Sequence, residues 1–395
     1  MRTFKKKHIY MVSLAFVLMG LASFILGISG GHPAKAWQAY LTNVLLWSAM
    51  AQGGLLFSMV CHLTHAKWGK TLEGVAESFA FFFPISFVLF IILFAGADHI
   101  FPWLKQDLYG KEQWLNLPFL FSRDMTGIAI LYGLGLAYLY YSLRLKLKGK
   151  EPSIRRSRFL YGLRLNEELD LNKENKKLSV LSVLYAIGYA VVLSILAFDL
   201  VMSLDIHWYS TLFGAYSFVK AFYVGLGGII ILSAILQRRY QFLSPSHFHD
   251  LGKLFLGFCL MWADFFYCQF VVIWYGNIPE ETTYIIKRTM TAPWGALAWT
   301  VFASAFVIPF FILLNRKIKT KPLFMLILSA LVIVGIWLEH QLLVGPALFP
   351  HAISFPLTVS DALIFIGFMG MMAMAVTFFV SLFPELWQIE HSEVK

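Results

Sequence analysis

Residues 9–29 read IYMVSLAFVLMGLASFILGIS, a stretch that contains no charged side chain. A helix rises about 1.5 Å per residue, so a run of this length covers the hydrocarbon core of a bilayer, which takes ~20 apolar residues. Arg2 and Lys5–Lys7 precede the run, as basic residues precede the apolar part of a signal peptide, but its length favours a span. We therefore expect the first membrane-crossing helix here.

The same kind of stretch recurs along the whole chain. Hydrophobic residues make up 59% of the 395 residues and charged residues 14%, whereas soluble domains carry roughly 45–50% and about 25%. A water-soluble surface cannot be built from this composition. We expect an all-α polytopic membrane protein, one integral membrane domain over residues 1–395, with about ten helices. Their predicted ranges are 9–29, 38–64, 77–97, 125–143, 178–203, 211–237, 251–275, 292–314, 322–344 and 360–383.

The 32 basic residues are distributed unevenly between the two sides of the predicted membrane domain. With a cytoplasmic N-terminus, most of them lie in inside segments, above all in segment 144–177. The outside segments hold only Lys35, Lys105, Lys111, Arg123, Lys287 and Arg288. The positive-inside rule then predicts that both termini are cytoplasmic. Anionic headgroups account for a net charge of +10 beside membrane spans, so we expect the lipid bilayer and no nucleic acid as a partner.

Two ionisable residues fall deep inside predicted spans. Lys220 lies about 14 Å and Asp264 about 17 Å from the outer ends of consecutive helices. A charge near the bilayer centre is costly without a partner. We therefore predict a buried Lys220–Asp264 pair, which serves either as a structural ion pair or as a step in a proton relay.

Other ionisable residues lie near the predicted helix ends. On the outer side they are solvated helix ends or members of a proton-exchanging pocket, since carboxylates and imidazoles transfer protons near neutral pH. The outer candidates are Asp199, Asp205, His207 and Glu339, of which Asp199 and Glu339 are the deepest. On the inner side they are ordinary interface residues or a proton entrance. The inner candidates are His62, Glu73 and Glu77.

The motifs of several cofactor sites are missing from the sequence. Cys61, Cys259 and Cys268 are isolated, without a C-x-x-C or C-x-x-C-H arrangement. The histidines lie in loops or near helix ends, whereas a membrane b-type haem needs two of them deep in facing helices. No metalloprotease, Walker or hydrolase motif occurs. We expect no metal, haem or iron–sulfur cluster in this chain, and no catalytic residue set of its own.

Three stretches go beyond generic membrane composition. Residues 198–213 read FDLVMSLDIHWYSTLF, residues 249–283 read HDLGKLFLGFCLMWADFFYCQFVVIWYGNIPEETT, and residues 338–350 read LEHQLLVGPALFP. Together they resemble the ActF subunits of bacterial alternative complex III, within the NrfD and polysulfide-reductase membrane-subunit superfamily. The resemblance runs from about the fourth predicted helix to the tenth and is weaker in the first third.

The resemblance implies a ten-helix subunit with two four-helix bundles and two peripheral helices, in the bacterial inner membrane. It also implies partners: a homologous NrfD-like membrane subunit, and multihaem cytochrome c and iron–sulfur subunits on the outer side that carry the redox centres. Family importance carries over to the positions inside the resembling strings, as partner-docking or quinone-site candidates. These positions are Asp205, His207, Trp208, Trp274, Tyr275, Asn277, Pro279, Glu280 and Glu281.

Three functions are compatible with this sequence. The resemblance favours a membrane subunit of a quinol:electron-acceptor oxidoreductase in a respiratory chain, which supports quinone binding, proton translocation or both, with menaquinone or its quinol as the candidate ligand. Charges in mid-span instead suit an independent secondary transporter. The third reading is a structural scaffold of the complex without chemistry of its own.

Overall fold

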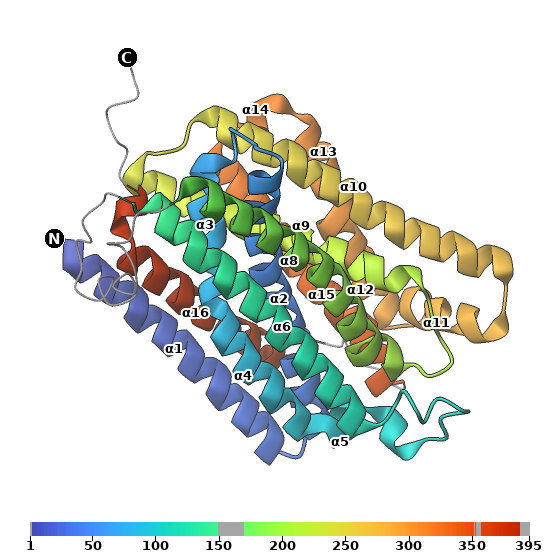
Figure 1. The fold of residues 1–395 in the computed structure, drawn as a ribbon. Coiled ribbons are helices and arrows are strands. Elements are labelled where there is room, and N and C mark those ends of the chain that lie inside the picture. The colour runs from blue at the N-terminus through green and yellow to red at the C-terminus, as the bar shows by residue number, and fades with distance from the viewer. Residues whose placement is uncertain (1, 149–169, 351, 353–356, 388–395) are drawn as a thin grey trace.

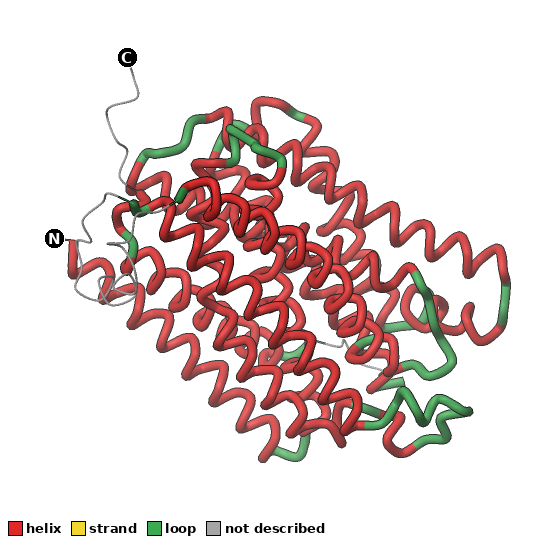
Figure 2. The backbone as a smooth tube through the Cα atoms, viewed as in Figure 1, coloured by secondary structure: helices red, strands yellow, loops and turns green. Residues whose placement is uncertain are grey.

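The computed structural model describes residues 2–148, 170–350, 352 and 357–387 (Figure 1). Residues 149–169 of the basic segment 144–177 lie outside this description. Within the described residues the regular elements are all helical, without a strand (Figure 2). Ten helical spans there are long and apolar enough to cross a membrane. The chain is therefore an all-α, multi-pass membrane protein, which confirms the predicted fold class.

Four spans from the first half of the chain pack into one group. Three are continuous: α2 (Pro33–Leu63), α6 (Leu117–Lys146) and α8 (Leu171–Leu200). The span predicted at 77–97 is longer and broken, because α4 restarts at Phe83 with Pro84, which has no N–H to donate. Its pieces are η1 (Lys70–Leu72), α3 (Glu73–Glu77), η2 (Ser78–Phe82), α4 (Phe83–Leu93), η3 (Phe94–Gly96) and α5 (Ala97–Ile100), with η4 (Pro102–Lys105) after them.

The next four spans form a second group. They are α9 (Leu212–Tyr240), α10 (Pro245–Gly276), the pair α12 (Trp294–Phe302) and α13 (Ile308–Leu314), and α15 (Pro322–Leu348). A π-helical turn, η6 (Ala303–Val307), joins α12 to α13 just before Pro309, and such turns accommodate a break in the hydrogen-bond ladder. Short helices complete the connections: η5 (Met202–Leu204), α11 (Pro279–Thr289) and α14 (Arg316–Lys319).

The remaining two spans, α1 (Arg2–Ser29) and α16 (Val359–Leu382), pack on each other along their length and against the first group, and η7 (Pro384–Trp387) follows. This is the arrangement of two bundles and two peripheral helices that the resemblance implies. α1 begins and α16 ends at the same end of the molecule (Figure 1). We call this end the termini end and the other the opposite end.

The two groups meet where α2 crosses α9. A Cβ atom on Gly53 would lie 2.3 Å from the carbonyl oxygen of Ala221, and one on Gly225 would lie 2.5 Å from the Gly53 carbonyl carbon. Only glycine therefore allows the two backbones to approach this closely, as small residues do between membrane helices. This crossing places Lys220, one turn before Gly225, at the boundary between the groups.

Candidate functional site

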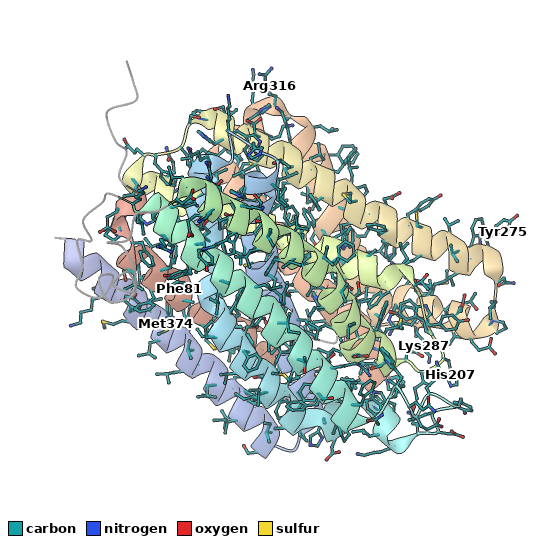
Figure 3. All side chains as sticks on the ribbon, viewed as in Figure 1. Phe81, His207, Tyr275, Lys287, Arg316 and Met374 are labelled. Carbon is teal, nitrogen blue, oxygen red and sulfur yellow. The ribbon has the colours of Figure 1, made fainter. Side chains whose placement is uncertain are left out.

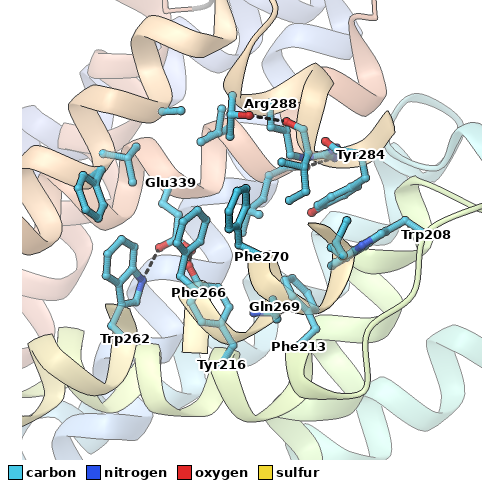
Figure 4. A pocket seen from close by; sticks show the side chains of 18 residues that line it. Trp208, Phe213, Tyr216, Trp262, Phe266, Gln269, Phe270, Tyr284, Arg288 and Glu339 are labelled. Atoms are coloured by element: carbon cyan, nitrogen blue, oxygen red, sulfur yellow. Dashed lines mark hydrogen bonds between the residues drawn. The ribbon is translucent and has the colours of Figure 1, made fainter. Parts of the chain in front are cut away.

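Glu339 on α15 is a buried carboxylate, 3% exposed, whose two oxygens both accept hydrogen bonds. Oε1 accepts from the Tyr216 hydroxyl and from Lys220 Nζ, the latter at 3.0 Å. Oε2 accepts from the Trp262 indole Nε1 at 3.1 Å (Figure 4). A carboxylate inside the hydrocarbon region is tolerated when it is paired and hydrogen-bonded, and these three donors meet that need.

The predicted Lys220–Asp264 pair is wrong. Lys220 pairs with Glu339, and Asp264 is exposed on the face of α10 that points away from the other helices. Depth along a helix does not fix the direction of a side chain. Asp264 follows Trp262 by two residues, which is about 200° around a helix with 3.6 residues per turn. Since Trp262 points inward to Glu339, Asp264 points away from the group.

A cavity of about 80 Å³ lies beside Glu339 in the half of the second group nearer the opposite end. Its lining is mostly apolar and rich in aromatic residues, and Figure 4 shows the rings from α9 and α10 around it. The aromatic members include Phe213, Tyr216, Trp262, Phe266, Phe270 and Phe302. A cavity of ~150 Å³ accepts a benzene ring, and a single water needs only ~10–15 Å³. The space therefore admits several waters as it stands, and a ring only if an aromatic side chain moves.

A stack of three side chains, Trp208, Tyr284 and Arg288, lines another side of this cavity. Tyr284 of α11 stacks on Trp208 with centroids 3.7 Å apart, and the Arg288 guanidinium lies 3.4 Å from the Tyr284 ring centroid. Arg288 donates to the Leu343 carbonyl at 2.9 Å and lies 3.6 Å from Asp205. Burial raises the pKa of Tyr284 to about 12, so its phenol remains a neutral donor at physiological pH. Burial also lowers the pKa of Arg288 from its ordinary value, but an arginine stays charged.

The three resembling stretches converge on this cavity. Residues 198–213 supply Trp208 and Phe213, and residues 249–283 supply Trp262 and several neighbours. Residues 338–350 supply Glu339, Leu342 and Leu343. The first and third stretches are more than a hundred residues apart in the sequence, and yet they line the same cavity. Of the predicted site residues, Glu339 and Trp208 line this cavity, Lys220 pairs with Glu339 at its wall, and Asp205 pairs with Arg288.

Lys220 lines a second, smaller cavity. This space of about 40 Å³ lies between the two groups, and its lining includes Ser48, Lys220 and His340. His340 follows Glu339 on α15, is buried, and its Nδ1 lies 2.8 Å from the Ile336 carbonyl oxygen. The ammonium of Lys220 therefore stands between the aromatic cavity and the boundary with the first group.

Asp199, predicted as a deep outer carboxylate, belongs to a separate cluster in the first group. Arg123 binds it through two parallel contacts, Nε to Oδ2 at 2.5 Å and Nη2 to Oδ1 at 2.6 Å. The Trp114 indole donates to Oδ1 at 3.0 Å, and its ring lies 3.9 Å from the guanidinium carbon. Asp124, 1% exposed, lies beside Asp199 in this cluster.

The predicted inner residues Glu73 and Glu77 form a cluster at the termini end. Lys146 Nζ lies 2.6 Å from Glu77 and 2.9 Å from Glu73. Glu77 is fully buried and accepts from Ser142 at 2.5 Å and from Ser58 at 3.1 Å. A cavity of about 720 Å³ leads to this cluster, and His62, Glu73 and Lys146 are among its lining residues. The predicted entrance residues thus lie together beside an open space.

A third polar cluster lies between these two. Tyr132 donates to or accepts from Ser86 at 2.7 Å and accepts from Gln52 at 3.0 Å, and all three side chains are buried. Closer to the termini end, Tyr138 is 3.1 Å from Ser58, which joins it to Glu77. Along α6 the steps from Tyr138 to Tyr132 and on to Asp124 are about 9 and 12 Å, at 1.5 Å per residue.

Several predicted residues do not join any of these clusters. His207 is exposed and its ring lies 5.3 Å from that of Tyr109. Trp274 is 67% and Tyr275 87% exposed near the last residue of α10, where Tyr275 lies away from the other helices (Figure 3). Asn277 ends that helix in the left-handed conformation, with φ 48°, and Glu280 and Glu281 begin α11 as exposed and half-buried side chains.

Sequence reasoning missed the neutral donors of the Glu339 site. Tyr216 and Trp262 were hidden among the many aromatic residues of the spans, since aromatic content alone does not single out a donor. One signal was present: Tyr216 precedes Lys220 by four residues, so the two lie on the same helical face. Arg123 was counted as an outside charge and Lys146 as part of the basic segment, without assigned partners.

The described residues contain no group of three or more His, Cys, Asp or Glu side chains arranged to hold a metal ion. Comparison with known proteins adds no family to these observations. No protein-family model matches the chain, and no curated protein matches it.

Proposed function

We propose that this chain is a membrane subunit of a quinol:electron-acceptor oxidoreductase of the alternative complex III type, and that it conducts protons for that complex. The observation that carries the proposal is the buried Glu339 carboxylate, held by Lys220, Tyr216 and Trp262 at the wall of a cavity large enough for water. A carboxylate of this kind takes up and releases protons where water reaches it. The three resembling stretches converge on the same place.

The first group supports the same role. Its polar clusters around Glu77, Tyr132 and Asp199 occur at successive depths, from the open cavity at the termini end to the opposite end. Waters that bridge the gaps along α6 complete a proton path in this proposal, because water-mediated hydrogen bonds are nearly as favourable as direct ones. Lys220, which stands between the groups, is the charge that links this path to Glu339.

Quinol binding in the aromatic cavity is the second candidate role of the same site. Oxidation of one quinol releases two protons and two electrons and leaves the quinone. In this chemistry the Glu339 carboxylate would accept one hydroxyl proton and water in the cavity the other, and both electrons would pass to an iron–sulfur or haem centre in a partner subunit. The aromatic lining favours this role, but a ring requires a shift of a side chain such as Phe266 or Phe270.

The membrane in this proposal is the bacterial inner membrane, with the termini end in the cytoplasm. The opposite end then faces outward, where the multihaem and iron–sulfur subunits bind. The exposed residues Trp274, Tyr275 and Glu280 at that end support docking there, since aromatic residues are enriched at interfaces between proteins and at membrane surfaces.

The test is a Glu339→Gln variant of the purified complex in sealed vesicles, measured for quinol oxidation and for proton movement. Gln keeps the size and one carbonyl acceptor, but its NH₂ group donates instead of accepting and the side chain cannot take up a proton, so we expect the rate to fall by roughly 10²-fold or more. Glu112→Gln is the matched control, because Glu112 is exposed in the loop before α6, outside the spans. Full turnover and full proton movement in Glu339→Gln would favour the scaffold function instead. Substrate transport by the chain alone, without multihaem and iron–sulfur partners, would favour the transporter.

A further inference from the structure

Asp264 is an ionisable side chain on the outer surface of a membrane span. It is exposed on α10, about 18 Å from the helix end at Gly276, and α10 is about 48 Å long. The hydrocarbon core is ~30 Å thick, so this position falls inside it. Within the part of the chain that the structure describes, no basic side chain pairs with Asp264. The Cys268 thiol, one turn further along α10, donates to Oδ1 at 3.9 Å.

The surface around Asp264 is a continuous stripe along α10. Gly257, Met261, Asp264, Val272 and Tyr275 fall within about 80° of one another on the helix, at 100° per residue. Met261 is 41%, Val272 67% and Tyr275 87% exposed. A Cβ on Gly257 would meet nothing within 4 Å, so a neighbouring helix can approach closely there. Of an 18-residue apolar stretch in each helix, only 17% is buried in α10, against 83% in α9.

Exposure alone does not imply a protein partner. α1 is exposed to a similar degree, with 11% of its apolar stretch buried. Its residues 9–29 carry no charged side chain, however, and this suits lipid contact. α10 differs because lipid tails offer no partner for the Asp264 carboxylate. Charged side chains in spans almost always face protein or water and pair with one another.

A second copy of this chain is a poor partner for this stripe. Copies inserted with the same topology and paired through the same face are related by an axis along the membrane normal, so Asp264 of each copy would lie at the same depth. Two carboxylates would then face each other in a low-dielectric medium, where like charges repel strongly. The complementary occupant carries the opposite charge.

We propose that the stripe Gly257–Met261–Asp264–Val272–Tyr275 on α10 binds a membrane-spanning helix of a different subunit, which presents a basic side chain at the depth of Asp264. The close approach at Gly257 and the ion pair at Asp264 together fix the depth and the rotation of that helix. This interface needs only the membrane setting and the surface of α10. It therefore holds whether or not Glu339 conducts protons.

The test uses the full chain in its native membrane, with a photoreactive benzophenone amino acid at Met261. The control carries the same group at Leu18 of α1, which is 56% exposed on a span without charge. We expect a product between this chain and one integral membrane protein from Met261 and none from Leu18. Sequencing of the crosslinked peptide identifies a span that contains Lys, Arg or His.

Charge exchange then tests the pair itself. Asp264→Asn should reduce the product by roughly tenfold or more. Asp264→Lys should abolish it, and an acidic residue in place of the identified basic one should restore it. Because Asp264 is exposed and contacts no buried charge, these variants should fold, and Asp264→Glu, which keeps the charge, should retain the product. A product of two copies of this chain, adducts with lipid alone, or a yield that is indifferent to the charge at position 264 overturns the proposal.

Discussion

Lys220 and Glu339 form an ion pair between α9 and α15, with 3.0 Å between Nζ and Oε1 and with both side chains almost completely buried. The pair lies at the boundary between the two four-helix groups. One partner lines the aromatic cavity and the other lines the space between the groups. It is therefore both a packing element and the centre of the candidate site.

Lys220→Met removes one partner and leaves the Glu339 charge buried. Breaking a buried pair in this way costs about 3–5 kcal/mol, because the remaining charge loses its compensation. We expect a clear decrease in the melting temperature of the detergent-solubilised protein. The double variant Lys220→Met, Glu339→Gln should recover much of this loss, since no uncompensated charge remains. A double variant as unstable as the sum of the single variants would show that the two side chains act independently.

Trp262→Phe tests the neutral donor to the same carboxylate. The change keeps an aromatic ring in the cavity wall but removes the indole N–H that binds Glu339 Oε2 at 3.1 Å. A hydrogen bond to a charged group contributes about 1.5–3 kcal/mol, so we expect a measurable loss in the free energy of unfolding. We also expect slower quinol oxidation by the complex, because Glu339 loses a constraint on its orientation. Trp299→Phe is the control, with an indole that is 70% exposed, and equal effects of the two changes would contradict this role.

The fold was predictable because it depends on local composition. Each span is a long apolar run, and residues 9–29 or 322–344 already indicate membrane helices without any tertiary information. Pro84 and Pro309 mark two positions in the sequence where a helix either kinks or packs closely. The form of each break could not be predicted, since 3₁₀ turns, a π-helical turn and a restarted α-helix have the same hydropathy as a continuous helix.

The site was predictable in part. The cost of a charge in the bilayer singled out Lys220 and Asp264, and Glu339 was predicted only as a deep outer carboxylate, because depth could not say which carboxylate Lys220 meets. That choice depends on how α9, α10 and α15 are rotated about their axes, and Trp262 and Asp264 occupy opposite faces of α10. Rotation follows from packing of the whole group, as at the Gly53–Gly225 crossing, and no single span encodes it.

Arg123→Lys tests the cluster around Asp199. Lysine keeps the charge but cannot make the two parallel contacts of a guanidinium or stack in the same way on Trp114. We expect a loss of stability of about 1.5–3 kcal/mol, as for a lost hydrogen bond to a charged group. Thermal unfolding in detergent measures it. Arg316→Lys, at an exposed position of α14, should leave the stability unchanged. An Arg123→Lys protein as stable as the original would argue against a structural role for the two parallel Arg123–Asp199 contacts.

The orientation of the chain in the membrane is tested by thiol labelling. His62 lines the large cavity at the termini end, and Tyr109 is 69% exposed in the loop between η4 and α6 at the opposite end, so cysteine at either position should react with a membrane-impermeant maleimide. With the termini in the cytoplasm, Tyr109→Cys is labelled in intact spheroplasts, whereas His62→Cys is labelled only after the membrane is broken. Cys61 lines the same cavity as His62 and Cys268 is partly exposed, so both are first replaced by Ser, whereas the buried Cys259 is kept.

The reverse labelling pattern would place both termini outside and overturn the orientation that the basic residues predict. It would also move the Glu77 cluster to the outer side and the Glu339 cavity to the cytoplasmic half. Protons released at Glu339 would then enter the cytoplasm, so the direction of proton movement in the proposed function depends on this result.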